Sequence, residues 1–130
     1  MLSGPESYAI CKKEDGRVIG AIALSLNGDS RLAEEEDECE LGYWIGKPFW
    51  GQGLMTEASE ALLRRAFTEL GMRRVWCAYF EGNEKSKRVQ EKLGFRHEKT
   101  LRDVDVPLLK EVRIEHVSLL SREAWRLKNM

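Results

Sequence analysis

The sequence predicts an α+β domain in which helices flank a mixed β-sheet. Apolar, β-rich runs alternate with two amphipathic segments, so hairpins and crossover helices should occur in the same chain. Asp15-Gly16 is a strong hairpin signal between the first two runs. The expected order is β-β-β-α-β-α-β-β. A chain of 130 residues is the size of one domain, so residues 1–130 are expected to fold as a single unit.

Three strands are expected in the first part of the chain. Tyr8–Cys11 has the pattern of a strand end, and Val18–Leu26 is a nearly continuous apolar run that fits a strand covered on both faces. The acidic run in 29–38 predicts a solvated loop or, alternatively, an acidic rim that attracts amines. Cys39–Gly46 is the third strand. Its internal Gly42 weakens a strand unless something needs close access to the backbone.

The helices are expected in the middle of the chain. Thr56–Leu70 carries an apolar stripe at helical spacing, and Gly71 is suited to end that helix. Arg74–Phe80 is apolar and aromatic, which predicts a strand. Asn83 is a good N-cap for a second helix over Glu84–Leu93.

Two strands and a short helix are expected at the end. Phe95–Leu101 and Val112–Leu120 have the composition of strands. Apolar alternation slips within the second of them, and a bulge near Glu115-His116 would explain the slip. Ser121–Trp125 could cap and begin a terminal helix.

Composition argues against several classes of protein. The apolar fraction of 42% is that of a folded domain, and the net charge of −1 gives no electrostatic support to nucleic-acid binding. No apolar run reaches the length of a membrane span, and the first residues lack the pattern of a signal peptide. We therefore expect neither nucleic acid nor membrane as a partner.

The cysteines and histidines predict packing roles. Cys11, Cys39 and Cys77 are odd in number and far apart, which argues against a disulfide framework or a zinc site. They are expected to be small core residues in a protein of the reducing cytoplasm, with no metal. His97 and His116 are isolated in the sequence and are expected to pack rather than to catalyse.

The most informative stretch is Glu40–Ala58. A strand and a proline turn lead through Gly51-Gln52-Gly53 into the first helix. This order can build a phosphate cradle, because glycines allow close approach and the first helical N–H groups point at an anion. The alternative is an ordinary tight turn. Thr56 stands where a Rossmann fingerprint needs its third glycine, and the turn lacks the Gly-Lys-Ser/Thr of a P-loop.

Segments in this order resemble the GCN5-related N-acetyltransferase (GNAT) superfamily, in particular the RimJ/RimL type that acetylates the N-termini of ribosomal proteins. The segments are Glu40–Ile45, Trp50–Ala58, and Asn83–Ser86 leading to Glu91–Phe95; the ending Glu115–Trp125 is also similar. Each segment alone is a weak signal. The ordered set is fairly specific and extends over most of the chain.

The resemblance implies that acetyl-CoA is the cofactor and that it lies between two splayed parallel strands, here Cys39–Gly46 and Arg74–Phe80. Its pyrophosphate is expected on backbone N–H groups of the glycine turn, and its pantetheine arm along the first strand. Lys87 or Arg88 could meet the 3′-phosphate; the alternative for both is a solvated helix face. The implied cofactor-binding residues are Trp44, Ile45, Gly46, Gln52, Gly53, Leu54, Met55, Thr56, Asn83, Ser86 and Lys87.

The resemblance further implies direct attack by a primary amine on the thioester in a ternary complex. The amine would be a protein N-terminus or a small molecule, and backbone donors of Tyr43–Ile45 could stabilise the oxyanion. Glu40 and Asp105 are candidate bases, acting through water, with structural or solvent-facing roles as the alternative. Ser86 could protonate the leaving thiolate or belong only to the helix start.

Two departures from the family pattern leave other functions open. Pro48 stands where the family commonly has Gln or Arg, and the usual first strand and helix pair, one wall of the amine site, are not recognised. We therefore expect an N-terminally shortened GNAT-like fold, in which a second subunit of a homodimer could supply that wall. The alternatives are a non-catalytic acyl-CoA-binding or interaction module and a purely structural domain. Amine-dependent release of CoA would separate them from the enzyme.

Overall fold

The computed structural model describes residues 6–26, 30, 32–51, 53–106 and 111–129. The elements in chain order are β1 Ser7–Cys11, β2 Val18–Leu26, β3 Glu38–Ile45, the 3₁₀ turn η2 Lys47–Phe49, α1 Leu54–Thr68, β4 Arg74–Phe80, α2 Glu84–Leu93, β5 Arg96–Val106, β6 Glu111–Ser121 and α3 Arg122–Lys128. Strands β2 and β4 and helix α2 have the bounds that the sequence predicts.

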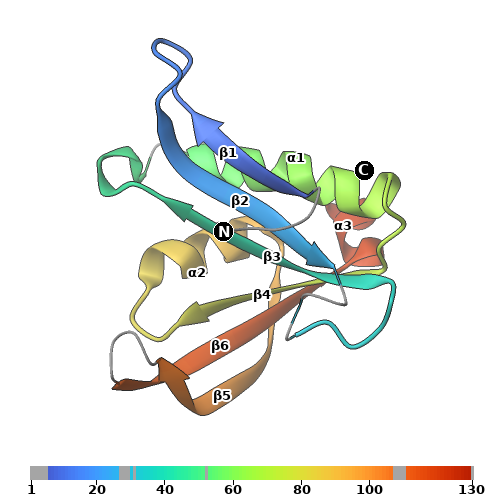
Figure 1. The fold of residues 1–130 in the computed structure, drawn as a ribbon. Helices are drawn as coiled ribbons and strands as arrows, with labels where there is room; N and C mark the ends of the chain where they lie inside the picture. The colour runs from blue at the N-terminus through green and yellow to red at the C-terminus, as the bar shows by residue number, and fades with distance from the viewer. Residues whose placement is uncertain (1–5, 27–29, 31, 52, 107–110, 130) are drawn as a thin grey trace.

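The strands form one sheet in the order β1-β2-β3-β4-β6-β5 (Figure 1). Strands β3 and β4 pair in parallel, and the other neighbouring pairs are antiparallel. The parallel connection is made by α1, whereas a hairpin joins β1 to β2; β5 and β6 are antiparallel neighbours that follow each other in the chain. The predicted fold class, a mixed sheet flanked by helices, is confirmed.

The remaining differences in bounds are at the ends of elements. Helix α1 begins two residues before the expected Thr56, because Gly53 takes the N-cap position in a left-handed conformation with φ of 75°. Strand β5 continues beyond the expected Leu101 to Val106. The terminal helix α3 is capped as predicted, since the Ser121 side chain accepts a hydrogen bond from the amide of Ala124.

The bulge predicted near Glu115-His116 is wrong, because the irregularities lie in the neighbouring strand. Strand β5 shifts register against β6 between His97 and Lys99, and again beside Asp103, whose φ is 58°. A positive φ is uncommon outside glycine, and aspartate is one of the residues that tolerate it. Each extra residue is thus accommodated in β5.

The slip in the apolar pattern of β6 has a different cause. Val117 packs with Trp76 in a small cluster on one face of the sheet, together with Leu119. Leu120 belongs to the main core on the opposite face. The strand is apolar toward both faces near its end, so its sequence shows no clean alternation.

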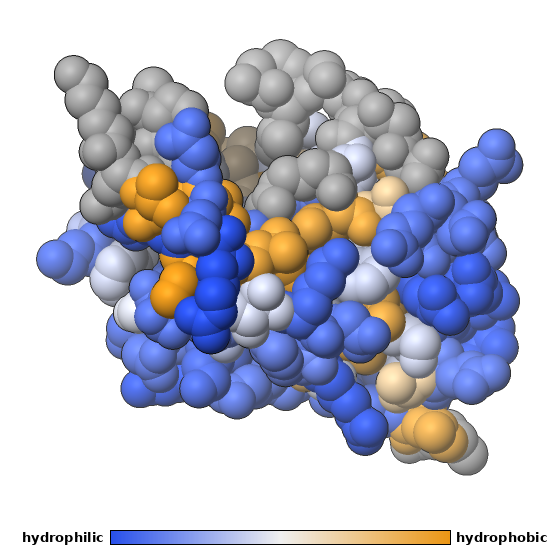
Figure 2. Space-filling view, turned by 90° about the horizontal axis from the view of Figure 1, so that it is seen from below, coloured by the Kyte–Doolittle hydropathy of each residue, from blue (hydrophilic) through white to orange (hydrophobic). Residues whose placement is uncertain are grey.

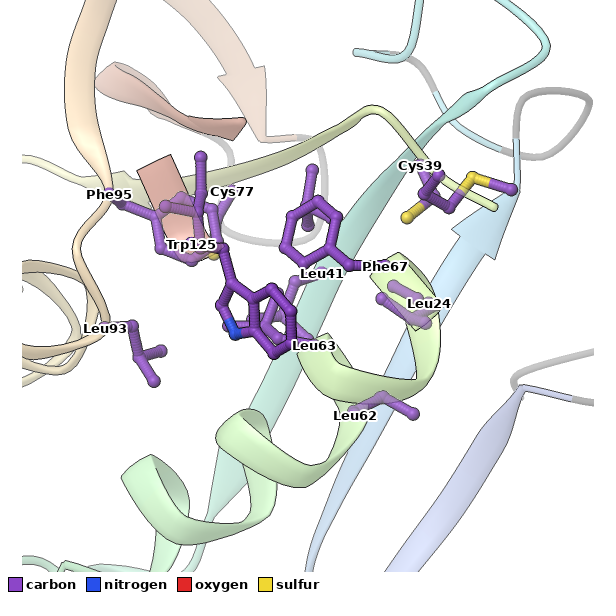
Figure 3. Packing of buried hydrophobic residues seen from close by; sticks show 14 of the residues in the cluster. Leu24, Cys39, Leu41, Leu62, Leu63, Phe67, Cys77, Leu93, Phe95 and Trp125 are labelled. Carbon is purple, nitrogen blue, oxygen red and sulfur yellow. The ribbon is translucent and has the colours of Figure 1, made fainter. Parts of the chain in front are cut away.

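The main core lies between the sheet and the helices. Phe67 of α1 and Trp125 of α3 contact each other with ring centroids 5.3 Å apart, and both pack toward the sheet (Figure 3). Leu41 from β3, Leu63 from α1 and Leu93 from α2 fill the space between the layers. Close packing on one face of the sheet fixes the start of each helix relative to β3 and β4.

The cysteines divide into two groups. Cys39 and Cys77 are buried in the main core, and burial raises the pKa of each thiol to about 12. Cys11 is exposed, so the prediction that it is a core residue is wrong. It lies at the end of the edge strand β1, where the register with β2 shifts and one side has no neighbouring strand among the described residues.

The surface is largely polar. The side seen in Figure 2 is mostly hydrophilic, with apolar side chains in a few separate patches, as expected when 33% of the residues are charged. Within the described ranges, no helix combines the length and the apolar character that crossing a bilayer requires.

The buried carboxylate of Glu38 connects the start of β3 to β4. The Glu38 side chain is fully buried; its Oε1 accepts hydrogen bonds from the Trp76 indole at 2.9 Å and the Glu34 amide at 3.0 Å. Its Oε2 lies 3.3 Å from Arg74 and 3.6 Å from Arg73. Burial by itself would raise the pKa of Glu38, but these hydrogen bonds and charges outweigh it and hold the pKa below its ordinary value of 4.5.

Replacing Glu38 by alanine should lower the free energy of unfolding by about 2–3 kcal/mol at pH 7, because the Trp76 N–H loses a charged acceptor and the arginines lose their counter-charge. The folded pKa lies below 4.5, so this stability is complete above that pH and is lost as the pH falls through the folded pKa. Urea unfolding at pH 7 measures the first effect, and a series at falling pH below 4.5 measures the second. Glu36→Ala is the matched control, because Glu36 is exposed. An equal loss of stability in both variants would contradict the stabilising role of Glu38.

Candidate active site

A cleft opens where the parallel strands part. Pairing between β3 and β4 is confined to Glu38–Glu40 with Arg74–Trp76. Beyond these residues the strands diverge toward their C-terminal ends, an arrangement that the resemblance to the family implies (Figure 1). A cleft of about 380 Å³ lies there, between β3, β4 and the starts of α1 and α2.

The lining of the cleft comes from both faces of the sheet. Side chains alternate between the two faces along a strand, and Tyr43 and Cys77 lie on the face that the helices cover. Trp44, Ala78 and Phe80 have the opposite parity. The cleft therefore passes through the sheet, so two ligands could meet within it from opposite sides.

Backbone is accessible along β3. Gly42 lines the cleft, and a Cβ built on it would meet no atom within 4 Å. The Ile45 carbonyl accepts a hydrogen bond from the Trp50 indole at 2.9 Å. Trp44 and Ile45, predicted to bind the cofactor, line the cleft, whereas Gly46 is not among the described lining residues. Its N–H is already engaged by the Ile19 carbonyl at 2.8 Å.

The N-terminus of α1 borders the cleft. Gly53 is the N-cap and provides no side-chain cap, so the N–H groups of Leu54, Met55 and Thr56 lie in the first turn without the usual capping oxygen. These residues and Gly53, all predicted to bind the cofactor, line the cleft. Gln52, also predicted to bind the cofactor, lies outside the described residues. Uncapped N–H groups and the helix dipole make this end suitable for an anion.

Helix α2 contributes polar and cationic groups. Asn83 caps the helix by accepting from the Ser86 amide at 3.2 Å, and both residues line the cleft. Lys85, Arg88 and Lys92 also line it, at the spacing of one helix face. Lys87, the predicted cationic ligand, is not among the described lining residues, whereas its neighbour Arg88 is.

Buried hydroxyl and amide groups form a network beside the cleft. The Tyr43 hydroxyl lies 2.7 Å from Ser86 Oγ. The Gln90 amide nitrogen lies 3.2 Å from Ser86 Oγ and 3.3 Å from the Tyr43 hydroxyl. Burial raises the pKa of Tyr43 well above its usual value of 10. The phenol therefore stays protonated near neutral pH.

Neither of the two carboxylates considered as candidate bases is among the described residues that line the cleft. Glu40, on β3, accepts a hydrogen bond from Ser30 Oγ at 2.8 Å and is not among the described lining residues. Asp105 is exposed on β5, opposite Val112, and is likewise not among them. Glu115 lines the cleft from β6 and is only 3% exposed.

Sequence reasoning did not identify Tyr43, Gln90 or Glu115 as side chains of the site. Tyr43 was considered for its backbone alone. In the sequence Gln90 is an ordinary residue of a predicted helix, and nothing there shows that its side chain contacts three different strands. A glutamate within the apolar last strand was a usable signal for Glu115, because a charge on a strand buried on both faces is costly unless it has partners or a function.

His97 and His116 pack against each other beyond the cleft, with ring centroids 5.8 Å apart, and neither is among the described lining residues. In the part of the chain that the structure describes, no group of three or more His, Cys, Asp or Glu side chains is arranged to hold a metal ion.

The chain belongs to the GNAT acetyltransferases: the family model for the acetyltransferase (GNAT) domain matches residues 3–96. YdaF of Bacillus subtilis, provisionally named a ribosomal N-acetyltransferase, is 40% identical over 89 residues, which are 68% of this chain and 46% of that protein. The chain spans about half the length of several curated relatives that it matches. The family predicted from the sequence is confirmed, and the name of YdaF agrees with the predicted branch.

Solved structures support the same family. A GCN5-related N-acetyltransferase from Brucella melitensis is 25% identical with a TM-score of 0.76, over 92% of this chain and 52% of that one. The ribosomal-protein-S5-alanine acetyltransferase of Vibrio fischeri has a TM-score of 0.79 at 20% identity, over 92% and 62% of the chains. At that identity the second comparison shows the fold alone.

Two glycines of the cleft should respond differently to alanine. Gly53 has φ of 75°, so Gly53→Ala should cost about 1–2 kcal/mol of stability from backbone strain. Gly42 has no positive φ and open space around its Cβ position, so Gly42→Ala should be neutral or slightly stabilising. Urea unfolding of the pair measures this contrast. Equal effects would argue against the left-handed cap at Gly53.

Proposed function

We propose that this chain is the catalytic domain of an N-acetyltransferase that moves an acetyl group from acetyl-CoA to a primary amine by direct attack in a ternary complex. The observation that carries the proposal is the cleft between β3 and β4, which joins an uncapped helix N-terminus to the opposite face of the sheet. The name of YdaF supports a protein N-terminus as the acceptor, with a small-molecule amine as the alternative.

The lining of the cleft suits a long anionic thioester. The pyrophosphate would be held by N–H groups of the Gly53–Thr56 turn, and the cationic face of α2, with Arg88 at its centre, would attract the phosphates. The extended pantetheine arm would lie along β3, where Gly42 leaves room beside the backbone. Asn83 and Ser86 border the same path.

The reaction depends chiefly on the alignment of the amine with the thioester. The amine lone pair attacks the thioester carbonyl carbon, so holding the two groups in line supplies a large part of the rate. An amine must lose a proton to react, and Glu115 is the buried carboxylate that lines the cleft on the face opposite the helices. Glu115 is therefore proposed to bind and deprotonate the amine, in place of Glu40 and Asp105, which are not among the described lining residues.

We place the protein in the cytoplasm as part of this proposal. Acetyl-CoA would be drawn from the pool inside the cell. The cysteines support this location, because none of the three forms a disulfide.

Acetyl-CoA should bind the wild-type protein with micromolar affinity in a calorimetric titration. Gly53→Glu should abolish this binding, because a carboxylate at the helix N-terminus would repel the pyrophosphate. Gly53→Ala is the matched control, since it has the same backbone strain without the charge. Absence of binding by the wild type would contradict the proposed function. Binding without amine-dependent release of CoA from a panel of amines would indicate an acyl-CoA-binding module instead.

Glu115→Gln should lower kcat/KM for the amine about 100-fold, while acetyl-CoA affinity stays unchanged, because the amide cannot accept the proton of the ammonium group. Steady-state kinetics against amine concentration measures the loss. Glu40→Gln and Asp105→Asn, measured in parallel, rank the three carboxylates. A larger loss in either of these would transfer the role of base from Glu115 to that residue.

A further inference from the structure

Gln90 is a buried amide that connects three strands and a helix. Its side chain is 2% exposed and lies in the middle of α2. Its Oε1 accepts a hydrogen bond from Ser118 Oγ at 2.6 Å. Its Nε2 lies 3.1 Å from the Ala78 carbonyl oxygen, 3.2 Å from Ser86 Oγ and 3.3 Å from the Tyr43 hydroxyl. One side chain thus contacts β3, β4, β6 and its own helix.

The direction of this amide is determined by its neighbours. The Ala78 carbonyl can only accept, so the atom that faces it must be the nitrogen. The oxygen then faces Ser118, whose hydroxyl donates to it over a shorter distance than the 3.1 Å to the Cys77 carbonyl. A reversed amide would place its oxygen against the Ala78 carbonyl and leave two acceptors facing each other. The N–H end is therefore held toward Tyr43 and Ser86.

The hydrogen atoms of the network can be counted from this direction. Gln90 has two N–H hydrogens; one goes to the Ala78 carbonyl and the other to the hydroxyl pair formed by Tyr43 and Ser86. One hydroxyl proton lies in the 2.7 Å contact within that pair. The other has, among the described atoms, only poor acceptors: the Ser86 carbonyl at 3.4 Å and the Cys77 sulfur.

These contacts leave one hydroxyl proton for a ligand in the cleft. Both hydroxyl groups belong to residues that line it. Because burial holds the pKa of Tyr43 above its usual range, the pair keeps both protons near neutral pH. Gln90 supplies hydrogen to the pair and takes none from it, so it turns the spare proton away from α2.

Resting on the acetyl transfer proposed above, we propose that Gln90 is a positioning residue for the transfer step, which holds the Tyr43–Ser86 pair so that its spare proton reaches the leaving sulfur. The amine nitrogen forms a bond to the carbonyl carbon, and the carbon–sulfur bond breaks with its electron pair going to sulfur. The sulfur takes the hydroxyl proton and leaves as the thiol. The proton lost by the amine restores the hydroxyl group through solvent.

A purely structural role for Gln90 has a different signature. In that role the amide only satisfies the Ala78 carbonyl. Its loss would then slow the reaction with all acetyl donors alike, or weaken the binding of the donors. Poor delivery of the proton instead leaves more negative charge on sulfur in the transition state. The rate then depends more steeply on the pKa of the leaving thiol.

The experiment compares wild type with Gln90→Met, Gln90→Glu and Ser118→Ala; the exposed Glu91→Gln on the same helix is the matched control. The acceptor panel consists of an alanine-initiated peptide, spermidine and benzylamine, with acetyl-CoA as the donor. A second donor series uses acetyl thioesters of aryl thiols that differ in pKa. Calorimetry gives acetyl-CoA affinity, and thermal unfolding confirms that each variant is folded.

We expect kcat with acetyl-CoA to fall about tenfold in the Gln90 variants and less in Ser118→Ala, with affinity changed by less than about twofold. The plot of log kcat/KM against thiol pKa should become steeper in these variants and stay unchanged in Glu91→Gln. Unchanged kcat, or an equal loss with every donor, would overturn the role of Gln90 while leaving the acetyltransferase intact. Ser118→Ala decides the question if the Gln90 variants do not fold. A wild type that acetylates no amine would overturn the proposed function, and this role with it.

Discussion

The short parallel pairing of β3 with β4 is the constraint on which the rest of the molecule depends. Three residues of each strand pair, and Glu38 fastens that end through the Trp76 indole and the arginine side chains. Because the strands are held together at one end alone, they can part at the other without separating the two halves of the sheet. Every group proposed to act on a ligand lies at the open end, while the groups that hold the strands together lie at the closed end.

Parting two strands exposes backbone groups that a continuous sheet would pair, and buried groups of this kind need partners. In this structure, side chains act as the hydrogen-bond partners of these backbone groups. Gln90 donates to the Ala78 carbonyl, beyond the last residue of β4 that pairs with β3, and Trp50 donates to the Ile45 carbonyl near the end of β3. The same two bonds tie α2 and the loop before α1 to the strands. The chain thereby sustains an open cleft in the middle of a sheet, where pairing would otherwise be expected.

Local features of the fold could be predicted because their causes are local. Periodicity identified β2, β4 and α2 with their bounds, and the conformational freedom of Gly53 pointed to the turn before α1. Long-range pairing was not predictable in the same way. The sequence does not show that Gln90 meets Ser118 across 28 positions, or that the extra residues are accommodated in β5 rather than β6. Glu40 and Asp105 were proposed from resemblance, whereas the burial of Glu115 beside the cleft becomes visible once strand order is known.

The division of the cysteines has a practical consequence. Cys39 and Cys77 are shielded by the core, and a thiol with a pKa near 12 carries almost no thiolate at neutral pH, the form that reacts with alkylating reagents. Cys11 is exposed on the edge strand and is not among the described residues that line the cleft. A maleimide dye should therefore attach to the unaltered protein at a single position. The protein therefore carries its own site for fluorescent labelling or surface immobilisation, at a residue outside the described lining of the cleft.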